Sequence, residues 1–160
     1  MTDPLPMAEV STRQFAKDVC NGLYQTIIAQ EQGVLEGDIE AIHDMRVATR
    51  RLRVALSNFA IIFSREDRRC LQSHLKNLAN ELGGVRDFDV MIEELQSRFR
   101  AKPREEAIKS VIGRLQARRR RRHHQLVKYL GEEDFAGFKR EYSSLWAEEA
   151  KEIKSHGQAA

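Results

Sequence analysis

Apolar side chains recur at three- or four-residue steps along almost the whole chain, and this periodicity constrains the fold more than any other feature. Four apolar residues from Phe15 to Ile27 follow one another at four-residue steps, and a ladder of leucines runs from Leu71 to Leu82. Such spacing places each set on one face of a helix. No segment alternates between apolar and polar side chains as a β-strand does. We therefore expect an all-α protein: an antiparallel up-and-down bundle of five to six helices, forming a single domain over residues 1–160.

Capping residues and glycines predict the limits of these helices. Gly33 stands where a C-cap would end the first helix, and Asp38 is a suitable N-cap for the second. The third helix begins near Arg65 and meets the pair Gly83-Gly84. This pair leaves two alternatives open: one kinked helix, or two helices with Asp87 capping the second. The other predicted helices are 38–63, 103–130 with Pro103 in its first turn, and 133–154, which buries Phe135, Phe138, Tyr142, Leu145 and Trp146.

Charge is distributed unevenly along the chain. The net charge is only +3, yet residues 43–69 hold seven basic and three acidic residues, and residues 101–130 hold ten and two. Two basic blocks within an otherwise acidic sequence indicate a polyanionic partner.

Composition excludes several classes of protein. The two cysteines, Cys20 and Cys70, lack the spacing of a zinc site or a disulfide framework. We therefore expect a reducing, cytoplasmic compartment. No apolar run approaches the ~20 residues that cross a bilayer, and the N-terminus has no secretory signal pattern. We expect no membrane association.

The helix predicted over 38–63 carries a row of cations away from its apolar stripe. When the residues are placed at about 100° intervals around the helix, one histidine and three arginines share a narrow strip, and Arg51 stands apart from it. No acid occupies the i+4 position after any of the four, so their charges repel without local compensation. This pattern favours a counter-charge from outside the protein, and a solvated basic face is the alternative. The four cations are His43, Arg46, Arg50 and Arg53.

Five consecutive arginines occupy residues 118–122. Helical periodicity puts Arg119 and Arg122 within or beside the apolar side of their helix. Because a buried unpaired arginine is very costly, each must meet an acid, a water-filled channel or an anionic ligand. The candidate acids within the chain are Asp87 and Asp89.

Three blocks of the sequence resemble the CHAD (conserved histidine alpha-helical) domain family. The first is His43-Asp44-Met45-Arg46-Val47 followed by Thr49-Arg50-Arg51-Leu52-Arg53, the second is Leu82-Gly83-Gly84-Val85-Arg86-Asp87-Phe88-Asp89-Val90, preceded by Lys76, and the third is the arginine run. The resemblance implies a non-catalytic helical domain that binds inorganic polyphosphate through basic residues lining a cavity, without a cofactor. The positions it implies for ligand binding are His43, Arg46, Arg50, Arg51, Arg53, Lys76, Arg86, Arg118, Arg119 and Arg122.

The resemblance also bears on partners and location. A complete CHAD domain is similar to two helical bundles facing each other, whereas this chain supplies material for about one. This difference implies a homodimer in which two copies rebuild the cavity. We expect a cytoplasmic protein, and binding of polyphosphate would associate it with polyphosphate granules.

Two other functions use the same residue types. A nucleic-acid-binding protein would need similar cations, but stacking platforms are sparse, because Tyr129 is the only aromatic residue near the arginine run. A metal-dependent hydrolase of phosphate esters or anhydrides would need metal-holding carboxylates or a phosphate-binding glycine loop. No P-loop motif occurs, and the adjacent His123 and His124 point about 100° apart, which makes a poor metal pair. We therefore expect binding without catalysis and no metal; a hydrolase would have to use Asp87, Asp89, Glu93 and Glu94.

Overall fold

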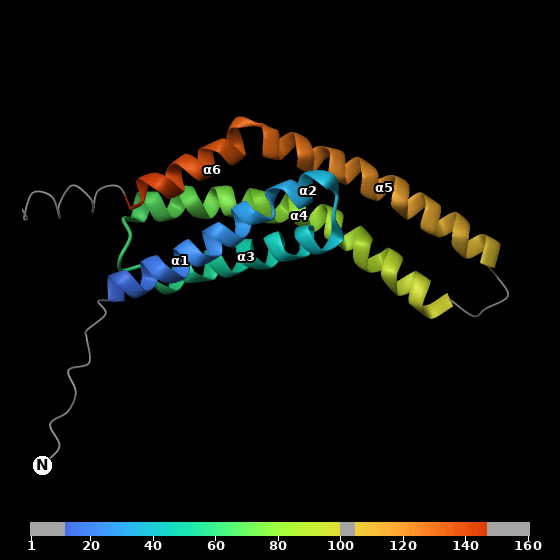
Figure 1. Ribbon diagram of the computed structural model, residues 1–160, viewed down its shortest axis with the longest axis horizontal. Helices are drawn as coiled ribbons and strands as arrows, with labels where there is room; N and C mark the ends of the chain where they lie inside the picture. The colour runs from blue at the N-terminus through green and yellow to red at the C-terminus, as the bar shows by residue number, and fades with distance from the viewer. Residues whose placement is uncertain (1–11, 100–104, 147–160) are drawn as a thin grey trace, which may run out of the picture.

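The structure is a computed structural model that describes residues 12–99 and 105–146, and this part of the chain forms helices without a strand (Figure 1). The all-α prediction is confirmed. The helices are α1 (Thr12–Ala29), α2 (Glu31–Glu36), α3 (Ile39–Asn58), α4 (Arg65–Phe99), α5 (Glu105–Gly131) and α6 (Glu133–Ser144).

The hydrophobic core lies mainly between α1, α3, α4 and α6, and Val34 of α2 and the end of α5 also contribute to it. α3 packs between α1 and α4, and α6 packs on the other side of α4. Tyr24 of α1 stacks on Tyr142 of α6, with ring centroids 3.9 Å apart and planes within 4°, and it also meets Phe138. These ring contacts close α1 against α6. Neighbouring helices run in opposite directions, as expected for an up-and-down bundle (Figure 1).

A two-helix arm extends beyond this bundle. Figure 1 shows the second half of α4 and the first half of α5 running side by side past the ends of α1 and α3. Its apolar residues are less buried than those of the bundle, and Val90, Met91 and Val111 are about half exposed. The arm is therefore a helical hairpin with a thin core of its own.

α4 is a single helix through the glycine pair, so the alternative of two helices with Asp87 as a cap is wrong. A Cβ added to Gly83 would lie 2.6 Å from Nη1 of Arg46. The glycine leaves room for the α3 arginine to lie across α4, and it does not mark a turn. The start of this helix near Arg65 is as predicted, with Ser64 as its cap: the Ser64 Oγ accepts a hydrogen bond from the Asp67 N–H at 3.0 Å.

The first helix ends earlier than predicted. α1 stops at Ala29, and Gly33 lies inside the short α2 instead of ending the first helix. A Cβ at Gly33 would come within 2.7 Å of the Ala41 Cβ, so this glycine permits the contact between α2 and α3. The residue that ends a helix is Gly37, with a φ of 81° in the left-handed region.

α3 begins as predicted and ends before the expected Phe63. The Asp38 side chain accepts a hydrogen bond from the Ala41 N–H at 2.7 Å, which confirms the N-cap. After Asn58 the backbone forms tight turns, including a hydrogen bond from the Ile62 N–H to the Phe59 carbonyl at 2.9 Å. These turns carry Phe63 back into the core, where its ring meets Trp146 edge-on. Phe63 is thus buried by a turn and not by a longer helix.

The last two helices agree with the sequence in their described parts. α5 covers most of the predicted 103–130, and Pro103 lies outside the described residues. α6 begins at Glu133 as expected and ends at Ser144, and residues 147–154 of the predicted helix lie outside the described residues. Leu145 and Trp146 follow α6 and pack against the core.

Candidate anion-binding site

Cations from α3 and α4 meet along the line where these two helices pack. Arg46 lies across α4, where its Nη1 donates to the Ala79 carbonyl at 3.3 Å. Arg53 lies one to two turns further along α3, and its Nε donates to Oε1 of Gln72 at 3.5 Å. The two arginines thus reach α4 at positions seven residues apart. They define an α3–α4 cationic strip, whose members are His43, Arg46, Arg50, Arg53, Lys76 and Arg86.

The spacing of α4 explains why its cations belong to this strip. Gln72, Lys76, Ala79, Gly83 and Arg86 follow one another at steps of three or four residues, so they share one face of the helix. Three of these five contact Arg46 or Arg53. Lys76 therefore lies between the contact points and Arg86 about one turn beyond them, and the first two sequence blocks come together in space.

The strip is underneutralised within the described part of the chain. Its six side chains are exposed or half-buried. None of them forms an ion pair with a carboxylate of the described residues. An anion approaching this face would meet several cations in succession without displacing an internal partner.

Arg50 and Arg51 also face a groove between α1 and α3. This groove has a volume of about 850 Å³ and is lined mostly by apolar side chains, including Val19 of α1 and Val54 of α3. Both arginines line the groove, but around the axis of α3 Arg50 lies closer to Arg46 and Arg53 than Arg51 does, so we count Arg50 with the strip. Of the predicted binding residues on α3, Arg51 is the one that does not join the strip.

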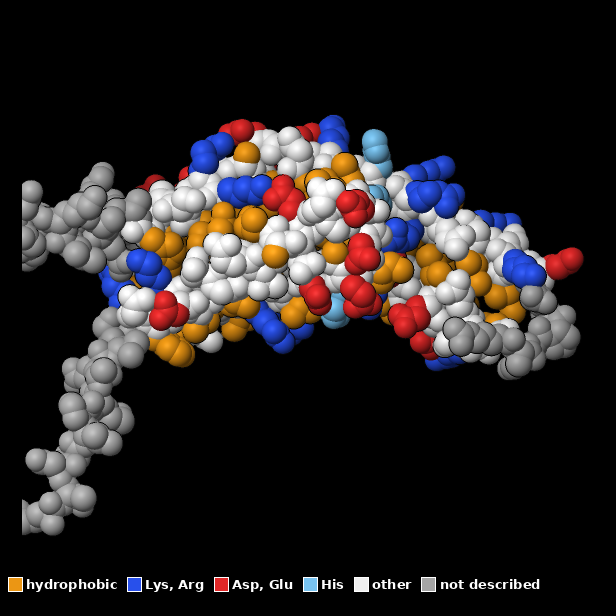
Figure 2. Space-filling model, in the orientation of Figure 1, with side chains coloured by type: hydrophobic (Ala, Val, Ile, Leu, Met, Phe, Trp, Pro, Cys, Tyr) orange, Lys and Arg blue, Asp and Glu red, His pale blue; other side chains and the backbone are white. Residues whose placement is uncertain are grey.

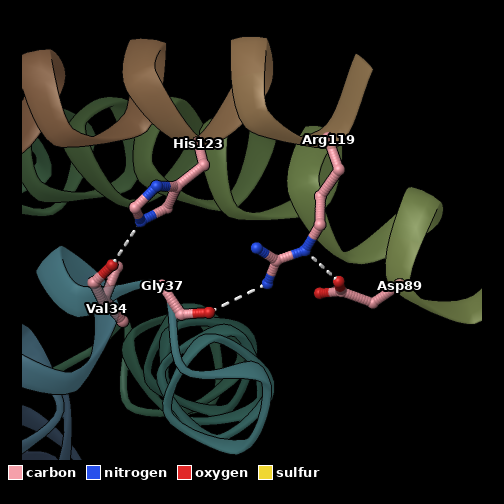
Figure 3. A network of polar contacts seen from close by, with 5 residues as sticks. All are labelled: Val34, Gly37, Asp89, Arg119 and His123. Atoms are coloured by element: carbon pink, nitrogen blue, oxygen red, sulfur yellow. Dashed lines mark hydrogen bonds and ion pairs between the residues drawn. The ribbon is translucent and has the colours of Figure 1, made fainter. Parts of the chain in front are cut away.

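Arg119 of the third block turns into the protein and not toward the strip. It forms an ion pair with Asp89, whose side chain is 2% exposed, and its Nη2 donates to the Gly37 carbonyl at 3.0 Å (Figure 3). One turn further along α5, the His123 Nε2 donates to the Val34 carbonyl at 2.8 Å. These contacts fasten α5 to α4 and to the turn between α2 and α3. Of the three partners expected for a buried arginine, Arg119 meets an acid of the chain: Asp89 is the one paired with it, and Asp87 is exposed.

Arg118 and Arg122 are exposed on α5. The Arg122 Nη1 donates to Oε1 of Gln125 at 3.1 Å within the same helix. Arg122 lies against Gly84, whereas Arg46 lies against Gly83. Because adjacent residues of a helix point about 100° apart, the cations of α5 approach a different side of α4. Of the ten predicted positions, Arg119 is engaged by Asp89 inside the protein and Arg51 lines the groove between α1 and α3.

One contributor to the site escaped the sequence reasoning. Gln72 holds Arg53 in place, because its Nε2 donates to the Arg53 carbonyl at 2.8 Å and to the Ser57 Oγ at 3.1 Å. The sequence does contain a signal for this role. Gln72 lies at three- or four-residue steps from Lys76 and Arg86, which places it on the same face of α4 as these two cations.

Carboxylates do not gather into a metal site among the described residues: they contain no group of three or more His, Cys, Asp or Glu side chains that could hold a metal ion. The Asp89 Oδ2 is buried and has no hydrogen-bond partner in this part of the chain.

Comparison with known protein families gives a match that contains all three sequence blocks. The sequence model of the CHAD domain family matches residues 19–160, which is most of the chain. The chain belongs to the CHAD family. In this CHAD protein the match includes all of α2 to α6 and thus both helices of the strip. Neither the curated proteins nor the solved structures contain a match to the chain. No helix in the described ranges has the length and apolar character needed to span a membrane.

Proposed function

We propose that this CHAD protein binds inorganic polyphosphate along the α3–α4 cationic strip, without catalysis. The observation that carries the proposal is the meeting of the first two sequence blocks on one face, where their cations have no carboxylate partner among the described residues. Membership in the family supports the same ligand.

The side chains of the strip suit a phosphate chain. Polyphosphate is a flexible polyanion without bases or rings, so recognition depends on charge and hydrogen bonding. The planar guanidinium of arginine donates two hydrogen bonds to one phosphate and stays charged. Arg46, Arg50 and Arg53 are one turn apart on α3, about 5–6 Å, and can therefore contact successive parts of one chain. Arg119 acts in this proposal as a positioning residue, because Asp89 and Gly37 already occupy its guanidinium.

The test compares charge reversals inside and outside the strip. Arg50→Glu should weaken polyphosphate binding about tenfold or more with little change in stability, because Arg50 is exposed. Arg114→Glu changes the net charge equally at an exposed position of α5 and should change affinity much less. Titration calorimetry measures both. Equal losses in the two variants, or a strong preference of the protein for single-stranded RNA at matched charge and salt, would reject the proposal.

Binding without catalysis has its own test. Polyphosphate incubated with the protein and Mg²⁺ should keep its chain length on a gel. Progressive shortening by the purified protein would make it a hydrolase and overturn this part of the proposal.

We propose in addition that two copies associate. The arm supports this, because Val90, Met91 and Val111 are 47%, 50% and 46% exposed on a hairpin that runs past the ends of α1 and α3. Figure 2 shows apolar side chains between the two helices of the arm. Light scattering should give the mass of a dimer, and Val111→Glu should give a monomer. A strict monomer that binds polyphosphate tightly would refute the association and leave the binding proposal standing.

A further inference from the structure

Three arginines gather at the start of α4, outside the three sequence blocks. Arg65, Arg68 and Arg69 line a hollow of about 310 Å³ together with Gln72. We refer to these three residues as the arginine cluster. They lie at the end of α4 opposite to Arg86, next to the turns that connect α3 with α4.

The charge of the arginine cluster lacks a partner in the described part of the chain. No ion pair joins Arg65, Arg68 or Arg69 to a carboxylate there. The neighbouring Asp67 is engaged in the helix cap, where its Oδ2 accepts from the Ser64 Oγ at 2.6 Å.

One arginine of the cluster has a buried nitrogen atom without a hydrogen-bond acceptor among the described residues. The Arg68 Nε is buried and has no hydrogen-bond partner among the described residues. A buried charged donor without an acceptor is destabilising. Arg68 lines the hollow, so an anion seated there would offset the charge of its guanidinium group.

The acids near the cluster lie on another side of α4. A second hollow, of about 700 Å³, is shared by Arg65 and Arg69 with Glu66 and Cys70. Burial, and then the nearby Glu141 of α6, raise the pKa of the Cys70 thiol. Negative charge thus approaches the Cys70 side, which leaves the hollow beside Gln72 as the one suited to an anion.

Gln72 joins the cluster to the α3–α4 cationic strip. It lines the hollow and also hydrogen-bonds to Arg53 of the strip. Arg65 and Arg68 precede Gln72 at the same three- and four-residue spacing that continues to Arg86. At 1.5 Å per residue, the cationic face of α4 is therefore about 30 Å long.

We propose that the arginine cluster is a second phosphate-binding station, which makes the site selective for long polyphosphate chains. This inference rests on the proposed function. A chain that occupies the strip continues past Gln72 into the cluster, where the guanidinium groups hold it at a second point. Binding at the strip raises the effective concentration of the chain end at the cluster. A short chain fills one station and gains nothing from the other.

The test uses tripolyphosphate and a polyphosphate fraction long enough to span the whole face, about 30 Å or more. The variant Arg65→Gln/Arg69→Gln removes two exposed charges of the cluster. Its affinity for the long chain should fall about tenfold, equivalent to about 1.4 kcal/mol, and its affinity for tripolyphosphate should change less than about twofold. Arg46→Gln, within the strip, should weaken both ligands. The control Arg120→Gln/Arg121→Gln removes two exposed charges from α5.

The outcomes separate this inference from the function on which it rests. If the cluster variant binds the long chain as wild type does, or loses no more affinity than the α5 control, the second station does not exist and the binding function stands. Equal losses for the long chain and for tripolyphosphate would also overturn the inference, because they would make the cluster part of a single site. If wild type binds neither ligand, the proposed function fails as well.

Discussion

Gly83 and Gly84 each make room for an arginine that comes from a different helix. A Cβ on Gly83 would lie 2.6 Å from Nη1 of Arg46, too close for both to stay in place. A Cβ on Gly84 would lie 3.5 Å from the Arg122 Nε, which is ordinary contact. The first glycine therefore fixes the position of a strip cation, and the second one does not depend on being glycine.

These distances predict different results for two alanine substitutions. Gly83→Ala should displace the Arg46 guanidinium and weaken its hydrogen bond to Ala79, lowering polyphosphate affinity about fivefold for about 1 kcal/mol lost. Alanine also favours helix over glycine by up to about 1 kcal/mol, so the free energy of unfolding should change little. Gly84→Ala should keep wild-type affinity within about twofold and raise stability. Calorimetric titration and urea unfolding measure the pair; the same affinity in both variants would contradict the role of Gly83.

Cys20 gives a prediction about pH. Burial in the core raises the pKa of its thiol from 9.0 to about 11. Between these values the unfolded thiol has lost its proton while the folded one keeps it, so the unfolded state binds fewer protons and the free energy of unfolding falls as pH rises. In Cys20→Ala this fall should be less steep. At pH 8 a thiol reagent should label the partly exposed Cys70 in the folded protein and reach Cys20 only after unfolding; rapid labelling of Cys20 in the native state would contradict its burial.

At the scale of helices, α5 is held on the bundle by three buried side chains near its C-terminal end, Leu126, Tyr129 and Leu130, and by a few polar contacts nearer its middle. Arg119 reaches Asp89 and Gly37, and His123 reaches Val34 (Figure 3). These contacts join α5 to α4 and to the turn that precedes α3. The Asp89–Arg119 pair is largely buried, with side chains 2% and 17% exposed, so it can hold the helices in one register but leaves a costly charge when it is broken.

Asp89→Ala should therefore destabilise the protein by about 3 kcal/mol, because it leaves the Arg119 guanidinium buried without its acid. Asp87→Ala is the matched control: it removes the same side chain from an exposed position two residues away, and should change the free energy of unfolding by less than about 0.5 kcal/mol. Chemical denaturation measures both. Similar stability of the two variants would mean that the pair does not hold α5.

The helices could be predicted from the sequence where a local pattern of residues was sufficient to determine them. The leucine ladder of α4 and the Asp38 cap of α3 are local patterns, and both are found in the structure. Glycines misled the prediction because their meaning depends on a distant neighbour: Gly83 faces Arg46 and Gly33 faces Ala41, and neither contact is visible in the chain before it folds. The same reason separates Arg119 from the strip, since an arginine run does not tell which of its members an internal acid will take.

For the molecule as a whole, the location of charge matters more than its sum. The net charge is +3. On the face shown in Figure 2, Lys and Arg side chains follow α5, and acidic side chains gather near the turn between α2 and α3. The acids of that region include Glu36, Asp38 and Glu40, all exposed. A polyanion therefore meets both attraction and repulsion, and its affinity should depend on where it lies.

Salt dependence distinguishes a local contact from the general field of the protein. Each phosphate neutralised by a cation releases counterions, and for single-stranded polyanions the slope of log K against log salt is about −0.7 per contact. Arg46→Gln/Arg50→Gln removes two strip cations, so the slope should become shallower by about 1.4. Arg120→Gln/Arg121→Gln removes the same charge from α5 without removing a contact of the strip, so it should make the slope only slightly shallower. Equal slopes in both double variants would mean that polyphosphate responds to total charge, and no strip of specific contacts would then be needed.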